Sequence, residues 1–539
     1  MRHPLLPLRW GLTAAFLLGC GADITETVLV DDVFGDGERP LTALTNTCRY
    51  NATTRLMTIA LVADEEALIT RELGASSPVD DFLLVNGFEC DVTVPAGTTP
   101  APVARITVST TGTGSESVTF DFANGSYALG GAVASSTGIS VALGSGSADT
   151  LSFRFGPGNE TIVYGASGAT FNGDTFRDLT VSGTEIHRLA LGDGADSYSG
   201  SGSPAAGSVF LPTTKVEVNG GEGNDTFLQG TLKTPREVLT GGAGSDSVSY
   251  TSRTVPITVS LSATADADDG DLSGGTAAEN DDLREDIETV IGGSAADTLT
   301  GGAGNDTLNG GNGADTISGG AGDDVVNGQN GNDTLLESLV GGAGSDVLNG
   351  GAGTDTVSYA GRTVTVDVSL DGSSNDGASG ESDNVGTDVE NITGGSGADT
   401  LTGGAGNNVL MGGPGDDVLA GGGGRDTASY ADHTAGVDAA LSPDGNATTG
   451  NGSGAENDSI AADIESLTGG SGADSLTGNA AANELVGGEG ADNLSGGDGE
   501  DVLEGGGPGN TASDTLSCGP GDGDIGYRQG AGTKNSCEL

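Results

Sequence analysis

Aspartates spaced nine residues apart are the first feature of this sequence that could do chemistry. Within residues 292–333 they stand at Asp297, Asp306, Asp315, Asp324 and Asp333, and each follows a glycine-rich run. Glycine tolerates positive φ, so such a run can form a tight turn whose carbonyl oxygens converge on one point. Carboxylate and carbonyl oxygens together suit a hard cation such as Ca²⁺, which takes about six to eight of them. The spacing therefore predicts a row of oxygen-lined cation sites.

The glycine-rich run and its aspartate belong to a nonapeptide, Gly-Gly-x-Gly-x-Asp-x-U-x, in which U is a large aliphatic residue. A weaker copy ends at Asp196. Further copies end at Asp225, Asp246, Asp346, Asp355, Asp399, Asp417, Asp426, Asp474, Asp492 and Asp501. Over residues 190–515 the pattern resembles the haemolysin-type (RTX) calcium-binding repeat family. The resemblance implies an all-β fold, a parallel β-roll or β-solenoid, with Ca²⁺ bound between successive turns, and it makes these aspartates, with the five above, the expected metal ligands.

Very short strands must position these turns. The residues after each aspartate form such a strand, and its U residue is expected to point inward, as at Leu299, Leu308, Ile317, Val326 and Leu335. Two nonapeptides make one coil. Asp297, Asp315 and Asp333 should therefore stack along one edge of the solenoid, and Asp306 and Asp324 along the other.

Departures from the pattern mark turns that we expect to bind weakly or to serve only as structure. Ala295 replaces the third glycine before Asp297, and Gln329 replaces the second glycine before Asp333. Asn408 and Asn483 stand where the period requires Asp, and Asn keeps an oxygen ligand but loses the charge. The alternative for the whole array is a metal-free glycine-rich solenoid or a disordered linker, but neither needs Asp at every ninth residue.

Three related inserts interrupt the nonapeptides. They begin at Tyr250, Tyr359 and Tyr430, and each is followed eleven residues later by a leucine. The second insert alternates apolar residues at 364, 366, 368 and 370, which predicts a half-buried strand. A loop rich in Asp, Asn, Gly and Ser follows, which is either simply solvated or a place for extra weak Ca²⁺ sites.

Each insert ends with a glutamate that precedes the next repeat aspartate by nine residues. These are Glu288, Glu390 and Glu465, and they should occupy aspartate slots where the chain re-enters the solenoid. Arg253 and Arg362 align with His433 of the third insert. We therefore interpret His433 as a surface or pairing residue rather than a catalytic one.

Composition limits the classes of function. The chain has 539 residues, 99 of them Gly, and a formal net charge of -58. Such a chain would be repelled by phosphate backbones and by anionic lipid surfaces, so nucleic-acid binding is excluded. Aromatic residues make up 4% of the chain, so the core must be built from small aliphatic side chains.

The amino terminus predicts export. Residues 1–19 have a short basic start and an apolar stretch that is too short to span a bilayer, which indicates a signal peptide. Its end, Leu17-Leu18-Gly19-Cys20, resembles the bacterial lipoprotein signal, which implies lipidation of Cys20. The alternative is an ordinary signal with a chance cysteine. We expect the membrane to be contacted through this anchor only, at the outer membrane or cell surface, or the protein to be extracellular.

Four further cysteines remain: Cys48, Cys90, Cys518 and Cys537. Export to an oxidising compartment and the grouping of these residues favour disulfides between the first two and between the last two, although three connectivities exist. A zinc site is disfavoured because no Cys-x-x-Cys spacing occurs. We expect a small β-rich unit over residues 20–103, a degenerate solenoid over 104–190, the calcium-binding repeats over 191–517, and a disulfide-tied cap over 518–539.

No catalytic motif is visible in the sequence. His-Glu-x-x-His, Gly-x-Ser-x-Gly and Gly-Lys-Ser/Thr are all missing, whereas a paired-carboxylate glycosidase site would not be recognisable from sequence. The sequence therefore predicts a calcium-binding structural or adhesive envelope protein that is not an enzyme, whose partners are calcium ions and an unidentified surface polymer or cell-surface ligand. The alternative is a calcium-dependent extracellular hydrolase with its site in residues 21–190.

Overall fold

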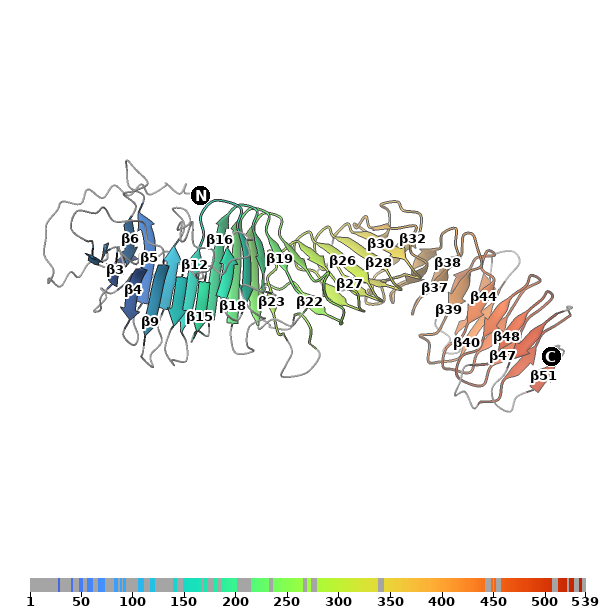
Figure 1. Cartoon of the computed structure of the whole chain (residues 1–539). Coiled ribbons are helices and arrows are strands. Elements are labelled where there is room, and N and C mark those ends of the chain that lie inside the picture. The colour runs from blue at the N-terminus through green and yellow to red at the C-terminus, as the bar shows by residue number, and fades with distance from the viewer. Residues whose placement is uncertain are drawn as a thin grey trace.

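A computed structural model describes the chain, with gaps, from residue 28 to residue 535. Its longer continuous stretches are 149–165, 186–200, 215–231, 236–264, 279–337, 344–441 and 457–506, and short segments are described before and between them. The described residues form β-strands joined by turns, with no helix among them, and nearly all the strands pair in parallel. The strands follow one another along an elongated molecule in chain order (Figure 1). This confirms the all-β parallel solenoid predicted from the repeat.

The strands form five large sheets and one small one, and within each sheet they are named in spatial order. The first sheet contains β34 (Asn384–Val385), β30 (Val347–Ala352), β28 (Val325–Asn330), β26 (Thr307–Asn312), β24 (Thr289–Ile291), β21 (Ser247–Ser249), β19 (Thr226–Leu228), β17 (Ser197–Ser199), β13 (Thr161–Gly165), β14 (Gly168–Phe171), β15 (Leu179–Ser182), β11 (Ile139–Ala142), β9 (Arg105–Thr110), β4 (Leu56–Leu61), β3 (Cys48–Asn51) and β8 (Asp91–Thr93). The second contains β23 (Asp282–Leu283), β20 (Glu237–Ala243), β18 (Lys215–Glu222), β16 (Ile186–Asp193), β12 (Thr150–Arg154), β10 (Ser117–Asp121), β5 (Glu66–Glu72), β6 (Phe82–Val85) and β7 (Phe88–Glu89).

The third sheet contains β22 (Thr258–Ser260), β25 (Thr298–Thr300), β27 (Thr316–Ser318), β29 (Thr334–Leu336), β31 (Thr356–Ser358), β35 (Asn391–Thr393), β37 (Val409–Met411), β39 (Thr427–Ser429), β44 (Ser466–Thr468), β46 (Glu484–Val486), β48 (Val502–Glu504) and β50 (Ile525–Tyr527). The fourth contains β33 (Gly377–Ala378), β32 (Val366–Ser369), β36 (Thr400–Thr402), β38 (Val418–Ala420), β43 (Ser459–Ile460) and β41 (Ala447–Thr448). The fifth contains β42 (Gly450–Asn451), β40 (Val437–Ala440), β45 (Ser475–Thr477), β47 (Asn493–Ser495), β49 (Thr515–Ser517) and β51 (Thr533–Asn535). The small sheet pairs β1 (Val28–Leu29) with β2 (Pro40–Leu41).

The strand register shows how the nonapeptides stack. Thr298 of β25 pairs with Thr316 of β27, which in turn pairs with Thr334 of β29. Each coil therefore contains two nonapeptides, one strand on each of two facing sheets. The aliphatic residues predicted to point inward are buried, with exposures of 0–1% for Leu299, Leu308, Ile317, Val326 and Leu335. A column of small aliphatic side chains therefore forms the core, as the low aromatic content requires.

Each insert replaces one sheet by another. Near its start each insert contributes the first strand of a new sheet, which is β22, β32 or β40. Near its end each insert contributes a strand that pairs with a sheet formed by earlier coils, which is β23, β34 or β43. The predicted alternation is confirmed for Val366, Val368 and Leu370, which are buried. It is wrong for Val364, which lies before β32 and is 55% exposed, because the strand begins only at Val366.

Buried aromatic residues of the core lie before the nonapeptides and in their first coils, and again at the tyrosines that begin the inserts. Phe120 and Phe153 stack with ring centroids 5.3 Å apart, and Tyr164, Tyr198 and Phe227 are also fully buried. Strands β4 and β6 lie in the region expected to be a small β-rich unit, and β9 lies in the region expected to be a degenerate solenoid. Strand β4 pairs in parallel with β9, so the first sheet continues from the nonapeptide region back to β9 and β4.

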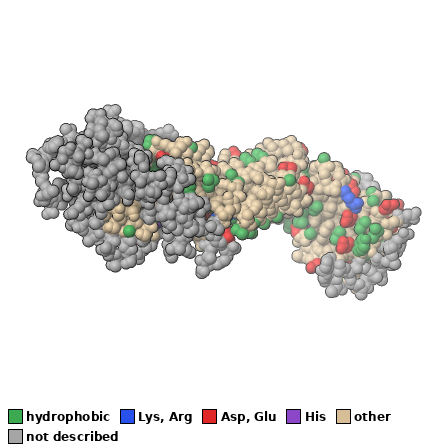
Figure 2. Space-filling model, in the orientation of Figure 1, with side chains coloured by type: hydrophobic (Ala, Val, Ile, Leu, Met, Phe, Trp, Pro, Cys, Tyr) green, Lys and Arg blue, Asp and Glu red, His purple; other side chains and the backbone are tan. Residues whose placement is uncertain are grey.

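Much of the acidic charge lies inside the described molecule. The turn aspartates from Asp225 to Asp501 that were predicted as metal ligands have exposures between 0 and 6%. On the face shown in Figure 2, acidic side chains are scattered over a surface made mostly of backbone and uncharged polar atoms. In the described part of the chain no helix has the length and apolar character needed to cross a membrane.

Candidate metal-binding edges of the solenoid

Hydrogen bonds link the turn aspartates into ladders along the two edges of the solenoid. The backbone N–H of Asp297 donates to Oδ1 of Asp315 (2.7 Å), and that of Asp315 donates to Oδ1 of Asp333 (2.8 Å). On the other edge the N–H of Asp306 donates to Oδ1 of Asp324 (2.8 Å). The predicted stacking is therefore confirmed. One carboxylate oxygen of Asp315, Asp324 and Asp333 is thus used to hold the preceding coil.

The glutamates at the ends of the inserts take part in the same ladders. Asp246 donates its backbone N–H to Oε2 of Glu288 at 2.7 Å. The equivalent distances are 2.8 Å from Asp355 to Glu390 and 2.9 Å from Asp426 to Glu465. Each glutamate thus occupies an aspartate slot, as the nine-residue spacing predicted.

In many of the stacked aspartates the second carboxylate oxygen is buried and receives no hydrogen bond within the described structure. This holds for Oδ2 of Asp196, Asp225, Asp246, Asp315, Asp324, Asp333, Asp355, Asp426, Asp492, Asp501, Asp514 and Asp524. A buried carboxylate oxygen without a donor is costly, because its lost hydration is not replaced. These oxygens lie in two rows and need either protons or cations.

Backbone oxygens face the same space. A Cβ atom built on Gly328 would lie closer than 3.0 Å to Oδ2 of Asp333 and to the carbonyl oxygen of Gly350 in the next coil. Only glycine leaves this space open. A carboxylate oxygen and a carbonyl oxygen that converge without a donor between them are the ligand types that Ca²⁺ prefers.

Several of the edge aspartates have raised pKa values, as expected for buried carboxyls with no positive charge beside them in the described structure. Burial raises the pKa of Asp315 and Asp324 to about 6, and neighbouring carboxylates add to the rise. Burial likewise raises the pKa of Asp355 to about 6 and that of Asp492 to about 7. Each shift means that the folded protein resists a bare negative charge at that place, which a bound cation would neutralise.

Comparison with known families identifies the repeat. The model of the RTX calcium-binding nonapeptide repeat matches residues 285–317, 300–335, 337–361, 393–428, 461–494 and 477–507. The chain carries RTX calcium-binding repeats. Such repeats bind multiple Ca²⁺ ions, and the buried oxygens of the stacked turns fit that ion. No curated protein matches the chain.

No single RTX turn holds enough carboxylates to bind a metal with side chains alone. Among the described residues no group of three or more His, Cys, Asp or Glu side chains could hold a metal ion. This agrees with the ladder geometry, in which each turn contributes one aspartate. The carbonyl oxygen of Gly350 beside Oδ2 of Asp333 shows where backbone ligands are available at these edges.

The RTX turns that directly follow the inserts have a different arrangement. Oδ1 of Asp297 accepts the N–H of Ile257 (2.9 Å) and its Oδ2 accepts that of Gly293 (2.7 Å). Asp399 and Asp474 repeat this pattern. Both carboxylate oxygens of these three aspartates are thus occupied by backbone donors.

Several residues of the ladders were missed by the sequence analysis. Asp281, Asp383 and Asp458, near the ends of the inserts, accept the backbone N–H groups of Glu237, Asp346 and Asp417. Each stands two residues before a buried aliphatic residue, Leu283, Val385 or Ile460, which is the spacing of the repeat and could have revealed them.

Three further acidic residues extend the ladders beyond the predicted set. Oδ1 of Asp514 and Oδ1 of Asp524 accept the N–H groups of Asp492 and Asp501. At the other end of the array, Glu160 donates its backbone N–H to Oδ1 of Asp196 (2.7 Å). These turns lack the full glycine run, so only the stacking of the coils reveals them.

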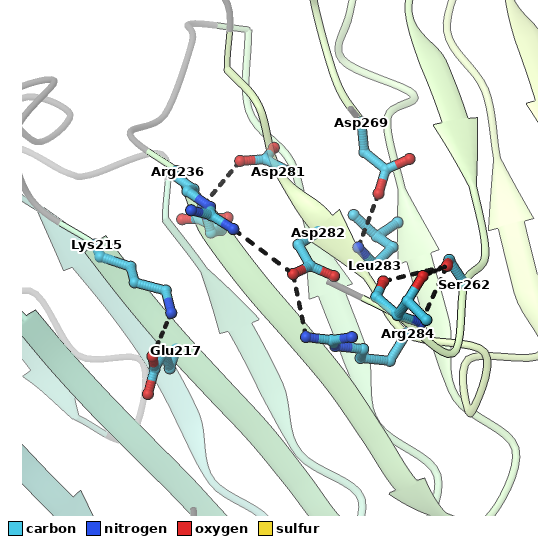
Figure 3. A network of polar contacts seen from close by, with 11 residues as sticks. Lys215, Glu217, Arg236, Ser262, Asp269, Asp281, Asp282, Leu283 and Arg284 are labelled. Atoms are coloured by element: carbon cyan, nitrogen blue, oxygen red, sulfur yellow. Dashed lines mark hydrogen bonds and ion pairs between the residues drawn. The ribbon is translucent and has the colours of Figure 1, made fainter. Parts of the chain in front are cut away.

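Acidic residues of the first insert are engaged by local partners. Asp269 accepts the backbone N–H groups of Ser260 (2.6 Å) and Leu283 (2.8 Å), and Asp282 pairs with Arg284 at 3.1 Å (Figure 3). The carboxylate of Asp269 therefore holds the insert's own strands together. The extra calcium sites suggested for these loops remain a prediction.

The aligned basic residues of the inserts have equivalent positions. Arg253 and Arg362 each lie 5.9 Å from the ring centroid of the tyrosine that begins their insert. His433 packs against Tyr430 with the ring centroids 5.4 Å apart and bonds Asp432 at 2.8 Å. This agrees with its interpretation as a pairing residue.

The buried guanidinium of Arg362 also forms ion pairs with Glu337 (3.2 Å) and Glu381 (2.7 Å), and Arg253 pairs with Glu279. Each insert with an arginine thus has a buried ion pair beside its first strand.

Of the cysteines, Cys518 is buried and forms a disulfide. Its pairing with Cys537 remains a prediction, because Cys537 lies outside the described residues, as do Cys20, Cys90 and the side chain of Cys48.

Proposed function

We propose that this chain is an exported, lipid-anchored solenoid with a structural or adhesive role at the cell envelope, whose folding is driven by Ca²⁺ bound along its two edges. Calcium binding itself follows from the RTX repeats, and proteins with such repeats are typically secreted or extracellular. The observation that carries the proposal is the double row of buried Oδ2 atoms that lack donors.

The ligands of this proposal are the predicted aspartates whose buried Oδ2 lacks a donor, with carbonyl oxygens of the glycine-rich turns. Because the sites exist only when the coils are stacked, binding free energy adds directly to the stability of the fold. At extracellular sites, dissociation constants of about 10⁻⁴–10⁻³ M are usual, so the protein would load calcium outside the cell.

One observation supports a structural rather than an enzymatic role. The described strands β9 to β17 pair into the same sheets as the repeats, which argues against a separate hydrolase domain in this part of the chain. The lipid anchor at Cys20 rests on the sequence Leu17-Leu18-Gly19-Cys20. Metabolic labelling of a bacterial host with a radioactive fatty acid should label the wild type but not Cys20→Ser, and equal labelling of both would refute the anchor.

The calcium proposal is tested by counting bound calcium in two charge-matched variants. Asp333→Asn removes the charge of a carboxylate whose buried Oδ2 has no donor. Asp323→Asn removes the charge of an exposed aspartate, whose Oδ1 accepts the N–H of Ser345. An asparagine can make this bond, because Asn305 accepts the N–H of Asp323 in the same way. After equilibrium dialysis, Asp333→Asn should bind less calcium than the wild type and Asp323→Asn the same amount. Equal counts for all three proteins would refute the role of Asp333.

A further inference from the structure

The two turns after each insert form a class of their own, which we call the junction turns. They are the turns that end at Asp297 and Asp306, at Asp399 and Asn408, and at Asp474 and Asn483. The other turns of the ladders are called the tandem turns. The two classes differ in backbone conformation and in the hydrogen bonds of the carboxylate.

The difference lies at the second residue of the glycine run. In the tandem turns this residue is in the left-handed region, with φ of +108° at Gly311, +104° at Gly320 and 77° even at Gln329. In the junction turns the equivalent residues, such as Gly293 and Gly302, are not in that region. A reversed peptide orientation therefore separates the two classes.

The orientation of this peptide decides what the carboxylate meets. In the junction turns the N–H of the second residue donates to the side chain, at 2.7 Å from Gly293 to Asp297 and at 2.6 Å from Gly302 to Asp306. In tandem turns such as those of Asp315, Asp324 and Asp333, Oδ2 has no donor among the described residues. An N–H that points at Oδ2 fills the place of a cation and would repel one, since Ca²⁺ must approach an oxygen to about 2.3–2.6 Å.

Two junction turns carry Asn instead of Asp and are fully satisfied. Oδ1 of Asn408 accepts the N–H of Gly404 (2.8 Å), and its Nδ2 donates to the carbonyl oxygen of Glu390 (2.7 Å). Asn483 makes the same pair of bonds, to the N–H of Asn479 (2.7 Å) and the carbonyl oxygen of Glu465 (3.0 Å). These turns are complete without a charge and without a metal.

Asp306 occupies the same position in the first set of junction turns. Its Oδ2 accepts the N–H of Gly302, whereas its Oδ1 is buried and has no hydrogen-bond partner in the described structure. In the two Asn copies a donating Nδ2 stands in place of this second oxygen. The site is therefore shaped for an amide rather than for a carboxylate with a cation.

The position of the first junction turn of each pair explains why it should close without metal. The first junction aspartate of each pair accepts the N–H of the residue at the start of the first strand of a new sheet or directly before it: Ile257, Val366 or Val437. No earlier coil of that sheet exists among the described residues to complete a site there. A turn whose own backbone N–H binds its aspartate can be the first turn of an edge without a metal, and the tandem turns can then stack on it.

We propose that the junction turns hold no Ca²⁺, so that the three inserts divide the calcium sites into separate runs. The proposal rests on the proposed function, in which the tandem carboxylates are the ligands. It departs from the sequence-based expectation that Asp297, Asp306, Asp399 and Asp474 are calcium ligands like the others. Each run would load independently, between joints that keep their structure without the ion.

Neighbouring positions on one edge provide the test. Asp306→Asn in a junction turn and Asp324→Asn in the next coil make the same chemical change. In the full chain, calcium is counted by equilibrium dialysis and thermal unfolding is followed in excess chelator. We expect Asp306→Asn to bind as much calcium as the wild type and to unfold at a higher temperature in chelator. Asp324→Asn should bind about one ion fewer.

A lower count for Asp306→Asn, similar to that for Asp324→Asn, would overturn the junction proposal while leaving calcium binding by the edges intact. Unchanged counts for both variants would instead refute the assignment of the tandem carboxylates as ligands, and the junction proposal with it. Asn408→Asp provides the reverse change in a turn that is complete as Asn. It should add no calcium and lower the unfolding temperature in chelator, and a gain of one ion would overturn the proposal.

Discussion

Acid should stabilise the calcium-free protein. Burial raises the pKa of Asp315, Asp324 and Asp355 from 3.8 to about 6 in the folded protein. A carboxyl whose folded pKa lies above its unfolded pKa binds more protons when folded. Its contribution to stability is therefore fully present below about pH 4 and is lost as the pH rises through about 6. In chelator the free energy of unfolding should fall as the pH rises over this range.

The size of the effect follows from the same pKa values. A rise from 3.8 to about 6 corresponds to at most about 3 kcal/mol for each carboxyl. Neighbouring carboxyls on one edge titrate as a set, so the contributions do not simply add. We expect the chelated protein to lose about 3–6 kcal/mol between about pH 4 and pH 7 from these three groups.

Calcium should reverse the sign of the pH dependence. The ion binds the ionised carboxylates, so protons compete with it and acid releases it. In excess calcium the unfolding temperature should therefore rise with pH up to about 7, because more of the sites are ionised and loaded. The protein thus has two stabilised forms, one protonated and one loaded with calcium.

Thermal unfolding followed by circular dichroism, in chelator and in excess calcium across this pH range, measures both slopes. Asp323→Asn is the control, because it changes an exposed aspartate whose neighbours keep their bonds. An unfolding temperature in chelator that rises with pH, or does not change, would refute the reasoning from the buried carboxyls.

Three further substitutions test the core, the inserts and the turns. Leu308→Ala removes a fully buried side chain and should cost about 2–5 kcal/mol in urea unfolding without changing the calcium count at saturation; loss below about 1 kcal/mol would contradict the core assignment. Arg362→Ala leaves two buried glutamates unpaired and should cost about 3–5 kcal/mol, whereas Arg425→Ala, at an exposed pair, should cost at most about 1 kcal/mol; equal costs would show that the buried pairs do not matter. Gly328→Ala should lower calcium binding because its Cβ would fill the space beside the Asp333 carboxylate, whereas Gly304→Ala meets nothing within 4 Å and should bind calcium normally; similar binding by both variants would argue against a site at that glycine.

The periodic features of the fold could be predicted from the sequence. The nine-residue spacing determined which aspartates stack, and the U positions determined the core, because both depend only on a regular coil. The re-entry of Glu288 at an aspartate slot followed from the same count. Local patterns were therefore sufficient wherever one coil repeats the one before it.

The sequence was insufficient where the coils stop repeating. The closed form of the junction turns depends on the orientation of one peptide, and Gly293 and Gly311 read alike in sequence although only Gly311 has positive φ. Asp383 lies in the ladder but follows an irregular loop, and the length of this loop hides the nine-residue period that would have revealed it. Asn408 was recognised as a departure, but the carbonyl oxygen that its amide meets comes from the preceding coil.

The charge of the chain gives the central claim its physical content. The formal net charge of -58 includes rows of buried carboxylates whose mutual repulsion opposes folding without calcium. A calcium titration of the full chain followed by circular dichroism, with reversal by chelator, tests the claim most directly. We predict a reduced β-signal in chelator near pH 7, a cooperative gain of signal as calcium is added, and loss of that gain when calcium is chelated again. A full β-signal in chelator that calcium does not change would contradict the claim.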